Sequence, residues 1–134
     1  MYLFDTNIFL EILLNQDQAD SCQKALSILR EDQPGWVTSF SLHAMEAIMG
    51  SARRISLLEH FLDALSDHPY LFSYSTTIEE EKEISQLSPK IHLDFDDTLQ
   101  FYVAKKKDLI LVTLDRDFKS VKGIEVILPC QIES

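Results

Sequence analysis

Two aspartates follow apolar runs that have the length of buried strands. Asp5 ends the run at residues 2–5, and Asp115 comes shortly after the run at 109–112, with Asp117 as a close alternative. In open parallel sheets, ligands bind just beyond the carboxyl ends of the strands. We therefore expect Asp5 and one of the two later aspartates to face the same site. Read alone, the later segment fits an Asx turn equally well, which is the commoner use of an aspartate after a strand.

Glu46 lies in a segment with helical periodicity. It shares an apolar stripe with Leu42, Met45 and Met49. A carboxylate on a buried helix face is costly unless it is paired with a base or bound to a cation. The alternative is a position at the rim of that face, where a base such as Arg53 neutralises the charge. Spacing alone leaves a functional and a structural interpretation of Glu46 open.

The acidic run around residues 94–97 offers one more candidate. Asp94 has the type and position of a helix N-cap, so its role is explained by capping alone. Asp96 and Asp97 point about a third of a turn apart, so at most one of them faces a given site. Asp97 shares a side with Phe101 and Ala104 and is therefore our choice over Asp96.

Several carboxylates that converge on one site repel one another unless hard cations neutralise them. Ligation by oxygen alone suits Mg²⁺ or Mn²⁺. Such ions activate a water and stabilise the oxygens of an in-line phosphodiester displacement. The hydroxyl of Thr113, just before the last acidic motif, is placed to fix a carboxylate or a water. The acidic residues thus favour metal-assisted phosphodiester chemistry.

The elements that must position these acids alternate along the chain. We expect strands at residues 2–5, 36–38, 71–74, 109–112 and 124–128, and helices at about 6–14, 18–31, 39–49, 53–66, 77–87 and 94–107. Gly50 and Pro89 are the expected ends of two of the helices. This order predicts a three-layer α/β fold with a mainly parallel central sheet. The length of 134 residues fits one domain over 1–134.

The composition is that of a globular protein, with 46% hydrophobic and 25% charged residues. Cys22 and Cys130 lie far apart and lack the spacing of a metal site, which suits a reducing compartment. No basic leader precedes the first apolar run, and no stretch approaches the ~18 uninterrupted apolar residues of a membrane helix. We therefore expect a cytoplasmic protein with no membrane contact.

The formal net charge is −10, from 12 basic and 22 acidic residues. This argues against a large non-specific surface for nucleic acid. It is compatible with an enzyme that gathers acids around cations, and it would suit a basic protein partner.

Four short motifs follow one another in the chain: FDTN at 4–7, SLHAME at 41–46, DDTLQ at 96–100 and TLDRDF at 113–118. As an ordered set, and with strands and helices in matching places, they resemble PIN-domain proteins of the VapC-like toxin ribonuclease kind. The resemblance covers nearly the whole chain. It implies an α/β/α sandwich and a metal-dependent endoribonuclease, that is, a hydrolase of RNA.

The resemblance also implies roles for single residues. Carried over position by position, the acidic quartet is Asp5, Glu46, Asp97 and Asp115, with Asp117 in support. Asp5, Asp97 and Asp115 would mainly hold metal, and Glu46 would ligate metal or orient the attacking water. Thr6 and Thr113 match polar positions of the family. The additional acids around the third and fourth motifs leave the choices of Asp97 over Asp96 and of Asp115 over Asp117 open.

Partners follow from the same resemblance. Arg116 and Lys119 flank the last motif and are candidates for contacts with RNA phosphates. The protein would be a toxin held silent by a cognate antitoxin, and a homodimer, with helices 8–14 and 53–66 supplying apolar surface. Two other classes are weighed against it: an aspartate-based phosphoryl-transfer or receiver-like domain, and a catalytically inactive PIN-like binding module.

Overall fold

Five short strands form a parallel sheet at the centre of the computed structural model, which describes residues 1–132. The strands are β1 (Tyr2–Phe4), β2 (Gly35–Thr38), β3 (Leu71–Tyr74), β4 (Ile110–Val112) and β5 (Val126–Ile127). Their order in the sheet is β3-β2-β1-β4-β5, and all four pairings are parallel. All strands therefore end at the same edge, with β1 in the middle of it.

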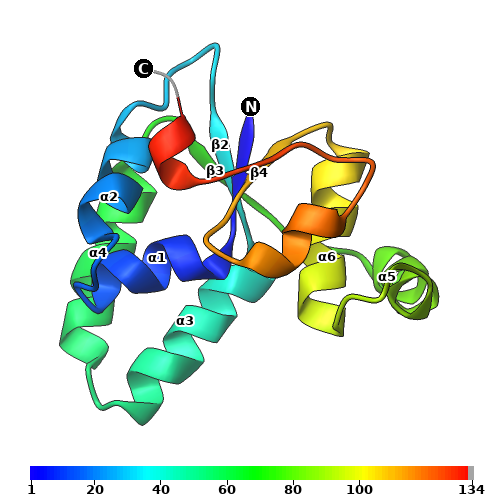
Figure 1. Cartoon of the computed structure of the whole chain (residues 1–134). Coiled ribbons are helices and arrows are strands. Elements are labelled where there is room, and N and C mark those ends of the chain that lie inside the picture. The colour runs from blue at the N-terminus through cyan, green and yellow to red at the C-terminus, as the bar shows by residue number, and fades with distance from the viewer. Residues whose placement is uncertain (133–134) are drawn as a thin grey trace.

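Helices cover both faces of this sheet (Figure 1). The α-helices are α1 (Thr6–Leu13), α2 (Ala19–Ser27), α3 (Ser39–Ser51), α4 (Ile55–Asp67), α5 (Ile78–Ile91) and α6 (Phe95–Lys106). The first four pack on one face, and α5 and α6 pack on the other. Two 3₁₀ helices, η1 (Arg116–Ser120) and η2 (Pro129–Gln131), follow β4 and β5. The three-layer α/β fold and the parallel sheet are confirmed.

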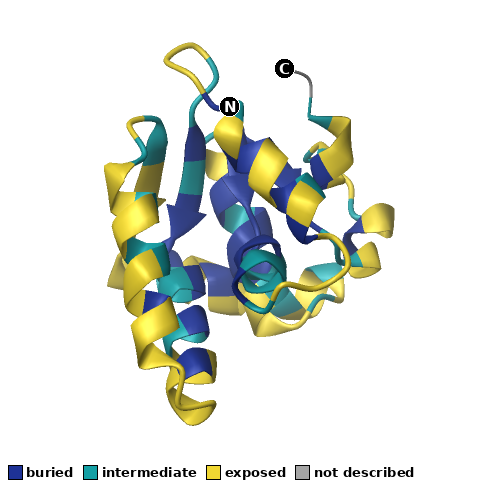
Figure 2. Cartoon of the chain, turned by 90° about the vertical axis from the view of Figure 1, so that its left-hand side faces the viewer, coloured by how far each residue is buried: buried dark blue, intermediate teal, exposed yellow. Residues whose placement is uncertain are grey.

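The alternation of side chains along the central strands creates two separate cores. Phe4 and Val112 are fully buried against α1 to α4, whereas their neighbours Leu3 and Leu111 are fully buried against α5 and α6. Figure 2 shows this buried centre beneath helices whose outer faces are exposed. Among residues 1–132, no helix combines the length and apolar character that a membrane span requires.

Three helices begin near the carboxyl edge of the sheet. Asp5 follows β1 directly and caps α1, Thr38 ends β2 and caps α3, and Asp94 caps α6. In each case a side-chain oxygen accepts a hydrogen bond from a first-turn backbone N–H, which satisfies a donor that the helix itself leaves unpaired. Helix N-termini and strand ends therefore converge on one region.

Two of the expected helix ends are wrong. Gly50 and Pro89 both lie inside helices, because α3 runs to Ser51 and α5 to Ile91. Residues with a left-handed backbone end these helices instead: Arg53 at φ 57° and His92 at φ 59°. The turn of α5 around Pro89 persists because Leu87 and Ile91 pack on the core beneath it, which offsets the one hydrogen bond that proline removes.

Other boundaries differ as well. The helix expected at 18–31 is the shorter α2, because the chain turns at Arg30, which forms a β-bridge with Gln33. The strand expected at 124–128 is only two residues long in β5. These differences leave the order of the elements unchanged.

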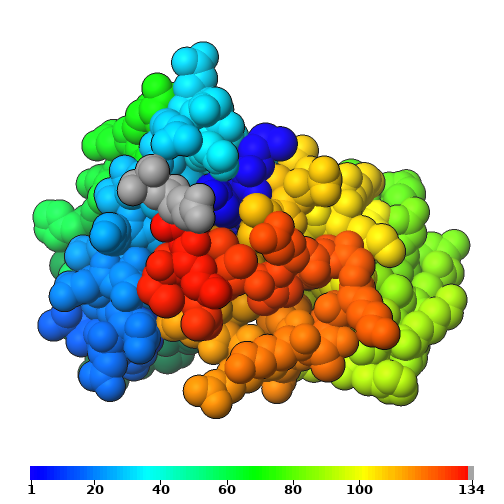
Figure 3. Space-filling model, turned by 45° about the horizontal axis from the view of Figure 1, so that its top comes forward, coloured from blue at the N-terminus to red at the C-terminus, as the bar shows by residue number. Residues whose placement is uncertain are grey.

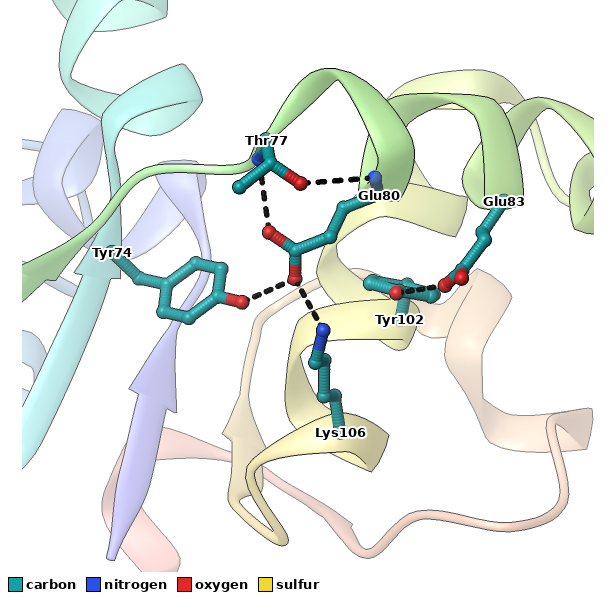
Figure 4. Close-up of polar contacts among 6 residues, drawn as sticks. All are labelled: Tyr74, Thr77, Glu80, Glu83, Tyr102 and Lys106. Atoms are coloured by element: carbon teal, nitrogen blue, oxygen red, sulfur yellow. Dashed lines mark hydrogen bonds and ion pairs between the residues drawn. The ribbon is translucent and has the colours of Figure 1, made fainter.

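Glu80 fastens α5 to its neighbours on β3 and α6 (Figure 4). Its carboxylate is almost buried and accepts hydrogen bonds from the Tyr74 hydroxyl, from Lys106 Nζ at 2.9 Å and from the Thr77 backbone N–H at 2.9 Å. Its own backbone N–H donates to Thr77 Oγ1 at 3.1 Å, which completes a capping box. The hydrogen bond from Tyr74, assisted by Lys106, lowers the pKa of Glu80 to about 2.

Replacing Glu80 by Gln should destabilise the protein by about 1–3 kcal/mol at pH 7, because the hydroxyl and the ammonium lose their ionised acceptor. Since the pKa of Glu80 is lowered on folding from 4.5 to about 2, its contribution is complete above pH ~4.5 and is lost as the pH falls towards 2. Urea unfolding at a series of pH values measures the difference from wild type. Glu79→Gln, one residue away and exposed, is the control. A difference that does not shrink on acidification would contradict the assignment.

Candidate metal centre

Three carboxylates meet beside the carboxyl edge of the sheet. Asp97 lies in the first turn of α6, Asp115 caps η1, and Asp117 lies in the first turn of η1. Each offers one carboxylate oxygen, and these oxygens all lie within 4.8 Å of one another. An all-oxygen donor set of this size fits a hard divalent cation such as Mg²⁺ or Mn²⁺.

Asp5 lies behind this group at the end of β1. The residue as a whole is 6% exposed. The carboxylate accepts hydrogen bonds from Thr6 N at 2.8 Å and from Thr113 Oγ1 at 2.7 Å. Burial raises the pKa of Asp5, the bonds from Thr113 and Thr6 partly oppose that rise, and the charge of Asp115 adds to it. Asp5 therefore lies within the electric field of the other acids.

The pKa of Asp97 rises from 3.8 to about 7. Partial burial is the largest cause, and the charges of Asp94, Asp115, Asp5 and Asp117 follow in that order. Four like charges acting on one carboxylate are the arrangement that a bound cation relieves. Asp96, the alternative that the sequence left open, is exposed and lies outside the three-carboxylate group.

Asn7 is a residue of this site that the sequence analysis did not assign. Its Nδ2 donates to Thr113 Oγ1 at 3.2 Å and to Asp5 Oδ2 at 3.3 Å, and its Oδ1 accepts from Leu114 N at 3.2 Å. Thr113 Oγ1 also accepts a hydrogen bond from Asp115 N at 2.9 Å. Asn7 thus connects the start of α1 to the segment that carries Asp115.

A second polar network joins three acid-bearing elements. The buried Ser41 hydroxyl accepts hydrogen bonds from Gln100 Nε2 at 2.7 Å and from Thr38 Oγ1 at 3.1 Å. It also shares a hydrogen bond of 2.8 Å with the hydroxyl of Thr6. Gln100 lies one turn after Asp97, and Thr6 follows Asp5. The network therefore fixes α6 and α3 relative to the end of β1.

The structure places Glu46 outside the three-carboxylate group. Its side chain is 40% exposed, and Oε1 lies 3.8 Å from Nδ1 of His43. The buried position that the apolar stripe suggested is therefore wrong: Met45 and Met49 face the core, and Glu46 lies at the edge of that face. Its neighbour there is His43, not Arg53.

Arg116 and Lys119, the candidates for phosphate contacts, are both exposed. They line a cavity of about 840 Å³ that Asp97 and Asp117 also line. Lys105, Lys106 and Lys107 lie elsewhere, at the end of α6, each over an aromatic ring.

The family model described as "PIN domain" matches residues 2–124 of the chain. No curated protein matches this chain.

Three solved structures with the same fold are a VapBC complex, a toxin and a toxin–antitoxin complex. VapBC2 from Rickettsia felis, bound to a promoter DNA fragment, has a TM-score of 0.78 and 17% identity, with 95% of this chain and 97% of that chain covered. VapC20 from Mycobacterium tuberculosis, a toxin that cleaves the sarcin-ricin loop, has a TM-score of 0.76 and 12% identity, with 94% and 98% covered. A toxin–antitoxin complex from Klebsiella pneumoniae has a TM-score of 0.72 and 20% identity, with 98% and 100% covered.

Replacing Asp97 by Asn should stabilise the metal-free protein. Because the folded protein holds the Asp97 proton more tightly than the unfolded chain, ionisation costs stability as the pH rises from ~4 to about 7. The advantage of the variant should therefore grow over this range and then level off. Unfolding in EDTA at several pH values measures it, with the exposed Asp96→Asn variant as control. Added Mg²⁺ or Mn²⁺ should stabilise wild type more than the variant. An advantage that is constant with pH would refute the electrostatic explanation.

Replacing Asn7 by Ala should weaken binding of Mn²⁺ by roughly 10–100-fold, because the residues that orient Asp5 and Asp115 lose their link. Calorimetric titration with Mn²⁺ measures the affinity, and circular dichroism verifies that the variant folds. Gln23→Ala, at an exposed position of α2, is the control. Equal affinities for the two variants would show that Asn7 does not position the acids.

Proposed function

Because the chain belongs to the PIN domain family, we propose that it hydrolyses RNA phosphodiester bonds as a divalent-metal-dependent endoribonuclease. The observation that carries the proposal is the group of three carboxylates, whose oxygens lie within 4.8 Å of one another at the carboxyl edge of the sheet. The cleavage of the sarcin-ricin loop by a toxin of the same fold supports RNA as the substrate. We take residues 1–134 as one PIN-like domain.

Asp97, Asp115 and Asp117 would hold Mg²⁺ or Mn²⁺ directly, with Asp5 beside them. When bound, such an ion activates a water and stabilises the oxygens of the phosphodiester. Glu46, which lies outside the three-carboxylate group, would orient the attacking water.

The threonines have supporting roles in the proposal. Thr113 holds the Asp5 carboxylate through its hydroxyl, and Thr6 holds it through its backbone N–H. Arg116 and Lys119, on the rim of the neighbouring cavity, would contact phosphates of the RNA.

We further propose that the protein is the toxin of a toxin–antitoxin pair and acts as a homodimer in the cytoplasm. The toxin–antitoxin complexes among the structures of the same fold support the partner. A basic segment of an antitoxin would be attracted to this chain, because the chain has a net charge of −10 and a cluster of carboxylates that the segment could neutralise. Ile55 and Leu57 of α4 are exposed apolar side chains on a helix expected to supply the dimer contact.

The receiver-like alternative disagrees with the topology. Receiver domains have the strand order 2-1-3-4-5, whereas the order here is β3-β2-β1-β4-β5. The inactive binding module differs from the proposal only in its chemistry, so the cleavage experiment decides between them.

Asp97→Asn should lower metal-dependent RNA cleavage by roughly 100-fold or more, because it removes a metal ligand worth several kcal/mol in the transition state. Asp96→Asn, at the adjacent exposed position, should keep wild-type activity. Digestion of total RNA in Mg²⁺ or Mn²⁺, with EDTA as a blank, measures both. Equal cleavage by the two variants would refute the assignment of Asp97, and an inactive wild type that binds no Mn²⁺ would favour the binding module.

A further inference from the structure

The cavity beside the carboxylates lies between two segments that are distant in the sequence. One wall is the last turn of α5 with the short link to α6, and the other is η1 with the residues after it. In Figure 3 the orange surface of the η1 region adjoins the yellow-green surface of α5 and α6. Its volume of about 840 Å³ is within the roughly 300–1,000 Å³ of sites that hold small molecules. It is large enough for a nucleotide unit.

Basic side chains are concentrated in this cavity against the trend of the whole chain. Lys90, Arg116, Lys119 and Lys122 line it, so 4 of the 12 Lys and Arg residues gather at one place in a protein with a net charge of −10. None of the four takes part in the ion pairs observed within residues 1–132. Their charges are therefore available to an anion from outside.

The rest of the lining consists of three aspartates, including Asp94, three apolar side chains, His92 and Ser120. Asp97 and Asp117 lie in the wall that the cavity shares with the metal centre. Ile91, Leu93 and Val121 are partly buried and give the cavity an apolar surface. Carboxylates that can hold a cation, basic groups that can contact a phosphate and an apolar surface for a base correspond to the parts of a nucleotide chain.

We propose that this cavity is a subsite for one unpaired nucleotide of single-stranded RNA, next to the phosphate that is cut. Lys90 and Lys122 contact its flanking phosphate from opposite walls, and the base lies against Val121 and its apolar neighbours. The inference rests on the proposed ribonuclease function. RNA fits better than an acidic protein segment, because bases have apolar faces that can be buried against Ile91, Leu93 and Val121.

The double variant Lys90→Gln/Lys122→Gln tests the subsite. In the Asp97→Asn background, which prevents cleavage, binding of a short fluorescent random-sequence single-stranded RNA is titrated at several salt concentrations. Because both lysines contact the same phosphate, their loss should make the log–log salt dependence less steep by about 0.7 and weaken binding roughly fivefold at ~0.1 M salt. The control is Lys24→Gln/Lys82→Gln, which has the same charge change at exposed positions of α2 and α5.

Competition identifies what the cavity binds. Unlabelled single-stranded RNA should displace the probe better than a duplex of the same sequence, inorganic polyphosphate or polyglutamate. Polyphosphate that competes as well as RNA would overturn the base contact, and polyglutamate that competes as well would point to a protein segment instead. If wild type cleaves RNA while the double variant binds like the control, the subsite is refuted and the ribonuclease stands. If wild type neither binds nor cleaves RNA, both are refuted.

Discussion

The parallel pairing of β1 with β4 is the constraint on which the acidic site depends. Phe4 lies opposite Val112, and Asp5 N donates to Val112 O at 3.0 Å, so the two strands end together. Asp5 and Thr113 leave the sheet at the same height, close enough for their side chains to bond. A slip of one residue would turn Leu3 and Phe4 to the wrong cores. The packing of the two cores therefore fixes the register, and the register places the first acid of the site.

Repulsion among the acids that this register brings together lowers the stability of the folded protein. Burial and four neighbouring charges raise the pKa of Asp97 to about 7, because they disfavour its ionised form. Rigid neighbours offset that cost: Phe118, one residue after Asp117, is almost fully buried, and Asn7 bonds both sides of the β1–β4 junction. A bound cation would relieve this repulsion and would stabilise the protein, since any ligand that binds only the folded state stabilises it.

Sequence patterns located the acids at strand ends and at helix starts because those positions obey local rules. The apolar runs before Asp5 and Asp115 predicted the strands, and the helical period separated Asp97 from Asp96. Local sequence rules could not predict contacts between segments that are distant in the chain. Asn7 bonds Leu114, which lies 107 residues away, and nothing in its own motif names that partner. Glu46 shows a second limit. An apolar stripe predicts which face of a helix packs on the core, but it does not predict how exposed a residue at the edge of that face is.

An acidic protein can still guide an RNA strand, because a strand responds to the local field and not to the net charge. The chain as a whole has a net charge of −10, but 4 of its 12 Lys and Arg residues line the cavity beside the carboxylates. In the proposed function, repulsion by the rest of the surface would disfavour a duplex, whereas a single nucleotide would fit the cavity of about 840 Å³. The distribution of basic residues would therefore favour recognition of a short unpaired segment over general binding of nucleic acid in the proposed ribonuclease.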